Sequence, residues 1–421
     1  MRNKINIIKI KTVFFQFAKY LPLLFFFLIQ CKKQVTPVNI EADKFLRVFQ
    51  DSNIQKGNIL VPSSDGGFLM LGKSILPNGI NADLQILKTS SIGELEWKKT
   101  IPVNLENPLT SVLKDGNFIS CSEQYPSKLS LINQQGEMLF NTSLAGGNNY
   151  FYSYPAQNNK GEFLIAGSNG QATGSASTSY VDRYSSKGNY INSKLFTDAS
   201  FGGKVLYLNI YDEDDSGSYY FYGFKFTAGW KWTDNAKIFV SKQKYSGNLF
   251  VSSLNVTIDS ANVDYQNFSM ASAFSGFFHL LTPDKKLVLI STQLKPNGDY
   301  RGYFVVLDEN LKILIEKPLE IGSTTTLPYG VSQTSEGNYL ITGACKTIGK
   351  QLNQPFACVI GSDGRLLWSK IFETPQNSSF NAGRELTNGQ LIFGGTSDGF
   401  GKGATLDDFF MMKTDKFGNI K

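Results

Sequence analysis

The residue types that most often carry out catalysis are scarce in this chain of 421 residues. It has one histidine, His279, in the apolar segment Phe277-Phe-His-Leu-Leu281. One imidazole excludes a metal site built on several histidines, and the segment around it shows no nucleophile setting for a Ser-His-Asp relay. We therefore expect His279 to line the core or a central channel, and we assign no catalytic residue, metal ligand or cofactor.

Acidic residues suggest two further kinds of chemistry. Asp234, Asp299 and Asp407 could act in polysaccharide cleavage, but they lie on different predicted loops, and such cleavage needs two carboxyl groups at a set separation. The segment Asp212-Glu-Asp-Asp-Ser-Gly217 is similar to the first half of a calcium loop. Tyr220 stands where a further oxygen ligand would be needed, so we predict an acidic hairpin there instead.

Two of the four tryptophans, Trp230 and Trp232, stand in a predicted surface loop, whereas the other two occupy equivalent positions on predicted strands. Aromatic rings on a loop can stack on sugar faces or anchor a partner protein. We predict a binding site for a ligand or partner at this loop, with Tyr300 and Arg301 of the next repeat as secondary members. Packing of the loop onto its own repeat is the alternative.

The first 30 residues have the layout of a secretory signal peptide. A basic region without acidic residues is followed by an apolar run over residues 21–30 and then by Cys31. This run is too short to cross a bilayer, and extending it back to Val13 includes Lys19, whose charge is costly inside a membrane. A retained membrane anchor is the alternative to cleavage.

The segment Leu28-Ile-Gln-Cys31 resembles the lipobox of bacterial lipoproteins, in which the cysteine receives the lipid. Gln30 departs from the small residue of that pattern, which concerns the efficiency of cleavage. The resemblance implies lipidation at Cys31 and a tether over residues 31–43. Two or three acyl chains hold a protein on a bilayer without a transmembrane helix, so we expect a cell-envelope protein on the outer membrane.

Charge excludes one class of partner. The formal net charge of the chain is +6, and five of these positive charges belong to residues 1–30. The mature chain is therefore close to neutral and is not expected to bind nucleic acid.

Three cysteines follow Cys31, so at least one of them stays outside any disulfide. Cys345 and Cys358 fall on the second and third strands of one predicted repeat, where they could be neighbours. The alternative is that they, like Cys121, are small buried hydrophobic residues.

Seven internal repeats decide the domain count. Each begins with a turn and has a small residue seven positions later; the starts are Asp65, Asp115, Lys160, Ser216, Asp284, Glu336 and Asn388. Intervals of 45 to 68 residues are typical of propellers. A second turn follows in each unit, at Gly93, Gly136, Gly188, Gly247, Asn310, Gly364 and Gly418, with Asn310 as the expected replacement for glycine.

Two turns divide each unit into four strands, and packing such a sheet between two like sheets buries both of its apolar faces. The last unit lacks a fourth strand, which the segment beginning at Lys44 can supply. In the expected register, Phe45, Arg47, Val48 and Phe49 match Trp368, Lys370, Ile371 and Phe372. The sequence predicts an all-β, monomeric, seven-bladed β-propeller over residues 44–421, closed by an N-terminal strand that completes the last blade.

The units resemble a repeat common in secreted and lipid-anchored proteins of Gram-negative bacteria, D-G-G-F-L-I-x-G followed by K-T-D-x-x-G-x-L-x-W-x-K-x-F. Asp65-Gly-Gly-Phe68 with Lys88-Thr89, and Lys413-Thr-Asp-Lys-Phe-Gly-Asn419, match this pattern best. The resemblance implies a propeller and carries no activity, because the repeated residues are turn and core positions.

Function is expected at the variable loops that join the second and third strands, since binding residues concentrate on loops held by a rigid scaffold. We favour a non-catalytic binding or scaffold module for a glycan or another envelope protein. A polysaccharide-degrading enzyme and an accessory subunit of an envelope assembly or uptake complex are the alternatives.

Overall fold

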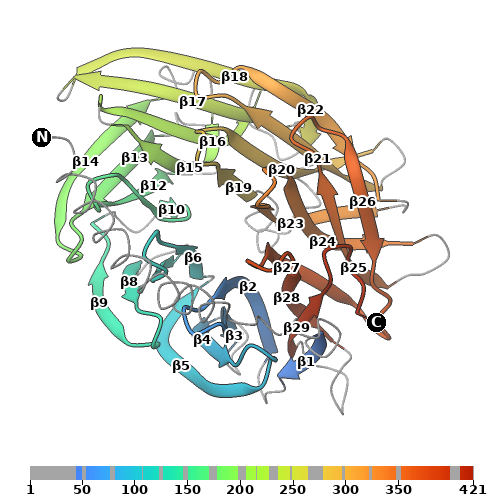
Figure 1. Cartoon of the computed structure of the whole chain (residues 1–421). Coiled ribbons are helices and arrows are strands. Elements are labelled where there is room, and N and C mark those ends of the chain that lie inside the picture. The colour runs from blue at the N-terminus through green and yellow to red at the C-terminus, as the bar shows by residue number, and fades with distance from the viewer. Residues whose placement is uncertain are drawn as a thin grey trace, which may run out of the picture. The chain divides into compact units, whose positions relative to one another are not determined.

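The computed structural model describes most of the chain after residue 43. The described residues are 44–49, 54–75, 81–106, 108–122, 127–145, 150–169, 178–197, 205–214, 216–226, 236–246, 249–263, 278–295, 299–321, 325–347, 352–398 and 408–420. They form 29 β-strands in seven antiparallel sheets arranged as blades of a ring (Figure 1). None of them belongs to an apolar helix that could span a bilayer.

The strands of the first three blades follow the chain from the centre outward. Blade 1 contains β2 (Ile54–Pro62), β3 (Phe68–Ile75), β4 (Asn81–Thr89) and β5 (Leu95–Glu106). Blade 2 contains β6 (Pro108–Val112), β7 (Phe118–Ser122), β8 (Lys128–Ile132) and β9 (Met138–Ser143). Blade 3 has a divided inner strand, β10 (Tyr150–Tyr152) and β11 (Ala156–Gln157), with β12 (Phe163–Asn169), β13 (Thr178–Tyr184) and β14 (Tyr190–Thr197).

The next three blades repeat this order. Blade 4 contains β15 (Val205–Glu213), β16 (Ser218–Phe226), β17 (Ala236–Ser246) and β18 (Leu249–Val263). Blade 5 contains β19 (Phe278–Leu281), β20 (Leu287–Leu294), β21 (Tyr300–Leu307) and β22 (Ile313–Leu319). Blade 6 contains β23 (Thr325–Gln333), β24 (Tyr339–Lys346), β25 (Asn353–Ile360) and β26 (Leu366–Ile371).

Blade 7 joins the two ends of the described chain. It contains β27 (Ser378–Glu385), β28 (Leu391–Ser397), β29 (Asp408–Thr414) and, as its outer strand, β1 (Phe45–Phe49). β1 pairs antiparallel with β29, from Phe45 opposite Lys413 to Phe49 opposite Phe409. Phe45 thus takes the place in blade 7 that Trp368 takes in blade 6, where it pairs with Val359. The predicted fold, the closing strand and its register are confirmed.

The core is divided among the seams between blades. Successive side chains of a second strand point into opposite seams, so that Leu69 and Leu71 face blade 2 while Phe68 and Met70 face blade 7. Seven clusters of buried hydrophobic residues result, one for each pair of neighbouring blades around the ring. This explains why the second and third strands are apolar on both faces, since each blade is covered on both sides.

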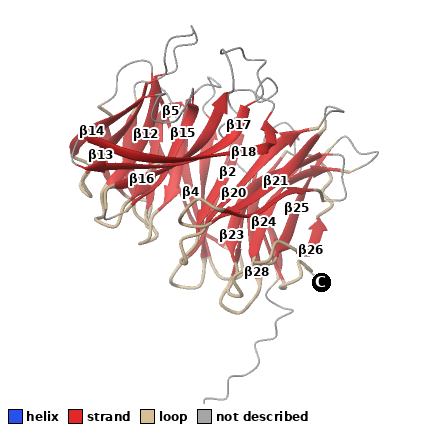
Figure 2. Cartoon of the chain, turned by 90° about the horizontal axis from the view of Figure 1, so that it is seen from above, coloured by secondary structure: helices blue, strands red, loops and turns tan. Residues whose placement is uncertain are grey.

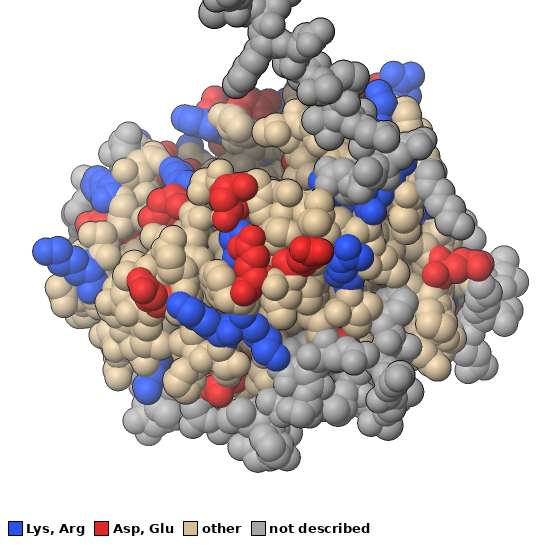
Figure 3. Space-filling model, turned by 60° about the horizontal axis from the view of Figure 1, so that its bottom comes forward, with Lys and Arg blue, Asp and Glu red and all other residues tan. Residues whose placement is uncertain are grey.

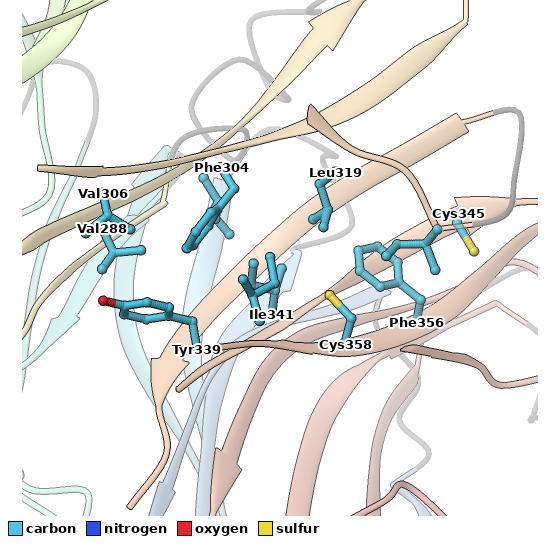
Figure 4. Packing of buried hydrophobic residues seen from close by; sticks show 12 residues of the cluster. Val288, Phe304, Val306, Leu319, Tyr339, Ile341, Cys345, Phe356 and Cys358 are labelled. Carbon is cyan, nitrogen blue, oxygen red and sulfur yellow. The ribbon is translucent and has the colours of Figure 1, made fainter. Parts of the chain in front are cut away.

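The seam between blades 5 and 6 shows the packing and settles the question of the cysteines (Figure 4). Ile341 pairs with Cys358, whereas Cys345 pairs with Gln354, so the two cysteines lie four residues apart along adjacent strands. Cys121, Cys345 and Cys358 are all buried free thiols. The interpretation of these cysteines as small buried hydrophobic residues is confirmed, and the possibility that Cys345 and Cys358 are paired neighbours is not, because adjacency of two strands does not place two residues at the same level.

Thirteen tight turns share one backbone hydrogen-bond pattern. The N–H of the fourth residue donates to the carbonyl of the first, and the N–H of the first residue donates to the carbonyl of the fifth. They span residues 63–67, 90–94, 113–117, 133–137, 158–162, 185–189, 214–218, 282–286, 308–312, 334–338, 361–365, 386–390 and 415–419. The fourth position has a positive φ, and in eleven turns it is glycine. In blade 5 it is Lys285, with φ 60°, and Leu311, with φ 59°. The assignment of Asn310 to this position was wrong by one residue, and Gly247 lies outside the described residues.

A recurring contact joins each outer strand to the next blade. Phe45, Trp97, Phe140, Ile315 and Trp368 hold equivalent positions on outer strands, and each packs against the glycine of the second turn in the following blade. A Cβ atom added to Gly93 would lie 2.4 Å from the Phe45 ring. A lysine two residues later often completes the contact: Lys99 donates to the carbonyl of Gln135 at 2.6 Å and Lys370 to the Asn419 side chain at 2.8 Å.

We predict that Phe45→Ala lowers the free energy of unfolding by about 3 to 5 kcal/mol, because it empties a buried site that closes the ring. Phe45 is 5% exposed, whereas its neighbour Leu46 is 38% exposed. Chemical denaturation of the chain lacking residues 1–30 measures the effect, and Leu46→Ala is the matched control, with an expected change within about 0.5 kcal/mol. Equal effects of the two changes would contradict the closing role of Phe45.

The two positive-φ residues that are not glycine give a second prediction. Lys285→Gly should raise the free energy of unfolding by about 1 kcal/mol, because an exposed L-residue is strained in this conformation. Leu311→Gly should lower it by about 1 to 2 kcal/mol, since Leu311 is only 2% exposed and its lost burial outweighs the relieved strain. Thermal melts of both variants test the pair, and a destabilised Lys285→Gly protein would refute the assignment of strain.

Candidate functional site

The propeller has two rims of different character (Figure 2). The tight-turn rim is formed by the thirteen turns given above, which join first to second and third to fourth strands. The loop-rich rim is formed by the opposite strand ends, where the connections between second and third strands and between successive blades lie. Many residues of these connections fall outside the described residues, among them Trp230, Trp232, Asp234 and Asp407.

The other two members of the predicted binding site lie at the loop-rich rim. Tyr300 and Arg301 begin β21, opposite Leu294 and Gln293 at the end of β20. The Arg301 guanidinium donates to the Gln293 side chain at 2.7 Å and lies 3.7 Å from a Glu320 carboxylate oxygen. Arg301 therefore contacts residues of its own blade while it remains half-buried at this rim.

The acidic segment at Asp212 folds as the predicted hairpin. Asp214 Oδ1 accepts hydrogen bonds from the backbone of Ser216 and Ser218, and Oδ2 accepts one from Tyr220 at 2.9 Å. The Asp214 carboxylate thus holds its own turn. Among the residues that the structure describes, no three histidine, cysteine, aspartate or glutamate side chains converge on a point that could hold a metal ion.

His279 lies at the junction of blades 4 and 5, on inner strand β19. Its Nδ1 atom is 2.8 Å from the hydroxyl of Tyr222, and the ring centroid of Tyr211 is 6.3 Å from that of the imidazole. Burial lowers the pKa of His279 to about 4 and raises that of Tyr222 well above its ordinary value. Both side chains are therefore neutral at physiological pH, and the contact is a hydrogen bond within a seam.

Asp182 is a buried carboxyl group that the sequence analysis missed. It lies on β13, is 2% exposed, and its Oδ2 atom has no hydrogen-bond partner in the described part of the chain. Burial raises its pKa to about 6, although a hydrogen bond with Ser193 acts in the opposite direction. The only sequence signal was an acidic residue inside the strand Thr178–Tyr184, which is not specific.

A second missed feature is a network of charged groups at the seam of blades 3 and 4. Arg183 on β13 forms an ion pair with Glu213 on β15 and donates to the Tyr219 hydroxyl at 2.7 Å. Glu162 lies 3.4 Å from the same guanidinium, and Asn158 donates to Glu213 at 2.9 Å. Because each of these partners lies in or beside a tight turn, the network fixes the two blades at the tight-turn rim.

The chain enters the propeller at the tight-turn rim. Phe45 is opposite Lys413, two residues before the turn at Asp415. Partial burial raises the pKa of Asp415, but hydrogen bonds from Asn419 and Phe417 and the charge of Lys44 together bring it below its usual value. Cys31 and the rest of residues 1–43 lie outside the described residues.

The side of the propeller shown in Figure 3 carries acidic and basic side chains interspersed, without a broad field of one sign. This agrees with the near-neutral composition of residues 31–421. Such a surface gives little long-range attraction for a polyanion.

Comparison with known proteins adds the fold alone. No protein-family model and no curated protein matches this sequence. The structure of the polysaccharide lyase Uly1 is similar, with a TM-score of 0.51, 11% identity, and coverage of 90% of this chain and 94% of that chain. The propeller domain of the Trilobed protease from Pyrococcus furiosus has a TM-score of 0.44 at 8% identity, over 88% and 98% of the two chains. A protein of unknown function from Bacteroides caccae has a TM-score of 0.40 at 14% identity, over 73% and 94%.

We predict that Asp182→Asn raises the free energy of unfolding at about pH 7.5 by about 1 to 3 kcal/mol, because the amide cannot ionise. The folded-state pKa of about 6 exceeds the ordinary value of 3.8, so the stability from the protonated carboxyl is complete below about pH 4 and lost as pH rises through 6. The gain should therefore vanish at pH 4, which denaturation at several pH values measures.

His279→Gln is the contrasting variant, because burial lowers the pKa of His279 whereas it raises that of Asp182. In the wild type, the contribution of His279 to the free energy of unfolding is lost as pH falls from about 6.5 towards 4. The glutamine variant should not show that part of the loss. If the gain from Asp182→Asn were the same at pH 4 and pH 7.5, Asp182 would not ionise in this range.

Proposed function

We propose that this protein is a lipid-anchored propeller of the bacterial outer membrane that binds a glycan or another envelope protein at its loop-rich rim, without catalysing a reaction. The observation that carries the proposal is that the chain enters at the tight-turn rim, beside Asp415. The secretory leader and Cys31 supply the anchor in this proposal.

The orientation follows from the length of the tether. Thirteen peptide units separate Cys31 from Lys44, and even fully extended they reach at most about 45 Å. Because the tether joins the propeller at Lys44, on the tight-turn rim, an anchor at Cys31 draws that rim towards the bilayer in this proposal. The loop-rich rim then faces away from the membrane, where large envelope components are accessible.

Binding is favoured over catalysis by where the unusual polar groups lie. His279, Asp182 and Arg183 all occupy seams between blades, within three residues of a tight turn. Their altered pKa values have structural causes, namely burial and contacts with neighbouring blades. On the loop-rich rim, Tyr300 and Arg301 are side chains that could contact a ligand, with Trp230 and Trp232 on the loop of the preceding blade.

Crosslinking in the native membrane, followed by purification of the full-length protein, tests the binding proposal. A Trp230→Ala, Trp232→Ala double variant should lose about tenfold or more of its captured glycan or protein, as expected when aromatic anchors are removed. Tyr190→Ala, an exposed aromatic change on outer strand β14, should capture as much as the wild type.

Two outcomes would contradict the proposal. Release of reducing ends or unsaturated sugars from envelope or plant polysaccharides would show an enzyme instead. Equal capture by the double variant would move the binding site elsewhere. The anchor is checked separately, because the wild type should incorporate a fatty-acid label and Cys31→Ala should not.

A further inference from the structure

The tips of the tight turns differ between blades in the polarity of one residue. The residue before the positive-φ position is the third of the five residues of each turn, and in eleven of the thirteen turns it is polar: Asp65, Asp115, Gln135, Lys160, Lys187, Ser216, Asp284, Asn310, Glu336, Asp363 and Asn388. In the other two turns it is Ile92 and Phe417, which are 43% and 57% exposed. Ile92 and Phe417 are therefore the two apolar residues at this position of the described turns.

The two apolar tips flank the point where the chain enters the propeller. Phe417 belongs to the turn that follows β29, the partner of β1. Ile92 belongs to the turn whose Gly93 packs against the Phe45 ring, and Lys413 joins the two turns by donating to the Ser91 carbonyl at 3.4 Å. The patch formed by Ile92, Phe417 and Ile420, the last 37% exposed, therefore lies on and beside the two turns nearest to Lys44, whose charge acts on Asp415.

We propose that this patch rests on the lipid bilayer in which Cys31 is anchored. The inference deepens the proposed function and depends on its anchor. Apolar side chains beside basic ones insert at the boundary between headgroups and acyl chains, and the Lys416 ammonium lies 5.0 Å from the Phe417 ring centroid. Glu94 is the acidic residue on the turn of Ile92, so the contact depends on apolar insertion more than on net charge.

Because the protein is tethered, a small apolar contact with the bilayer is sufficient to keep the patch on the membrane. Two or three apolar side chains would bind a bilayer weakly from solution, but a chain of thirteen peptide units keeps the patch at a high effective concentration near the membrane. The patch and Lys44, to which the tether is joined, lie on the same rim, so both can be engaged at once. Among the thirteen described turns, both apolar tips lie on the turns beside Lys44, where the tether joins, which favours the bilayer over a partner protein as the occupant.

An environment-sensitive fluorophore next to the patch tests the inference. Ser91→Cys and Ser186→Cys place the label at the same position of second turns in blades 1 and 3, next to Ile92 and Lys187 respectively. Both serines are exposed, and the native Cys121, Cys345 and Cys358 are fully buried and do not compete for the label. The full-length lipidated protein is reconstituted into vesicles of phosphatidylethanolamine and phosphatidylglycerol.

The expected result is a blue-shifted emission and roughly threefold slower quenching by iodide for the label at residue 91 than for the label at residue 186. Adding Ile92→Ser and Phe417→Ser should return the label at residue 91 to the behaviour of the control. Equal emission and quenching at the two sites in vesicles would overturn the inference, as would a shift that occurs only when solubilised envelope proteins are added.

Flotation of the vesicles distinguishes failure of the anchor from failure of the patch. If the lipidated protein does not float, the proposed anchor fails. The same labels are then measured on a protein in which a histidine tag replaces residues 1–31 and binds a chelating lipid. A shift in that arm supports contact between patch and bilayer, and no shift refutes it.

Discussion

The ring depends on a contact between an outer strand and a glycine. At five seams an apolar side chain of the fourth strand packs against the turn of the next blade, and a Cβ atom added at Gly93 or Gly188 would collide with the ring of Phe45 or Phe140. The same glycines have a positive φ, so one residue satisfies the turn and the contact together. In blade 7 the outer strand is β1, which supplies Phe45 for this contact.

Closure of the ring therefore depends on one seam that both ends of the described chain share. The seam between blades 7 and 1 contains Phe45 and Phe49 together with Met411 and Phe68, so its core is built from both ends of the chain. An unpaired edge on β29 would expose both its backbone groups and this apolar face. Release of β1 would therefore uncover the seam between blades 7 and 1 first, because each blade is covered only by its two neighbours.

Much of this architecture could be predicted from the sequence, because its signals are local and repeated. Turn glycines, the apolar second strands and the aromatic residue of the outer strand recur at nearly fixed offsets, which was enough to place Phe45 in register with Trp368. Leu311 was missed because no pattern reveals an L-residue at positive φ. The offset of Cys345 from Cys358 and the contact of His279 with Tyr222 depend on strand register and on the neighbouring blade.

A binding site is harder to predict than the fold for a related physical reason. Residues in the seams are constrained by packing on both sides, and this constraint leaves a repeated pattern in the sequence. Loops at the loop-rich rim carry no such constraint, and Tyr300 and Arg301 could be placed only by counting from the strands beside them.

The contacts that stabilise the ring are concentrated on the tight-turn rim, whereas the loop-rich rim is free to vary. Turns, the Arg183 network and the contacts of the outer strands occupy the tight-turn rim, so substitutions there are limited by the fold. Exposed apolar residues that persist on such a constrained rim, as Ile92 and Phe417 do, are not explained by packing within the ring. The loop-rich rim can vary without loss of the seams, which is the condition under which one scaffold accommodates different ligands.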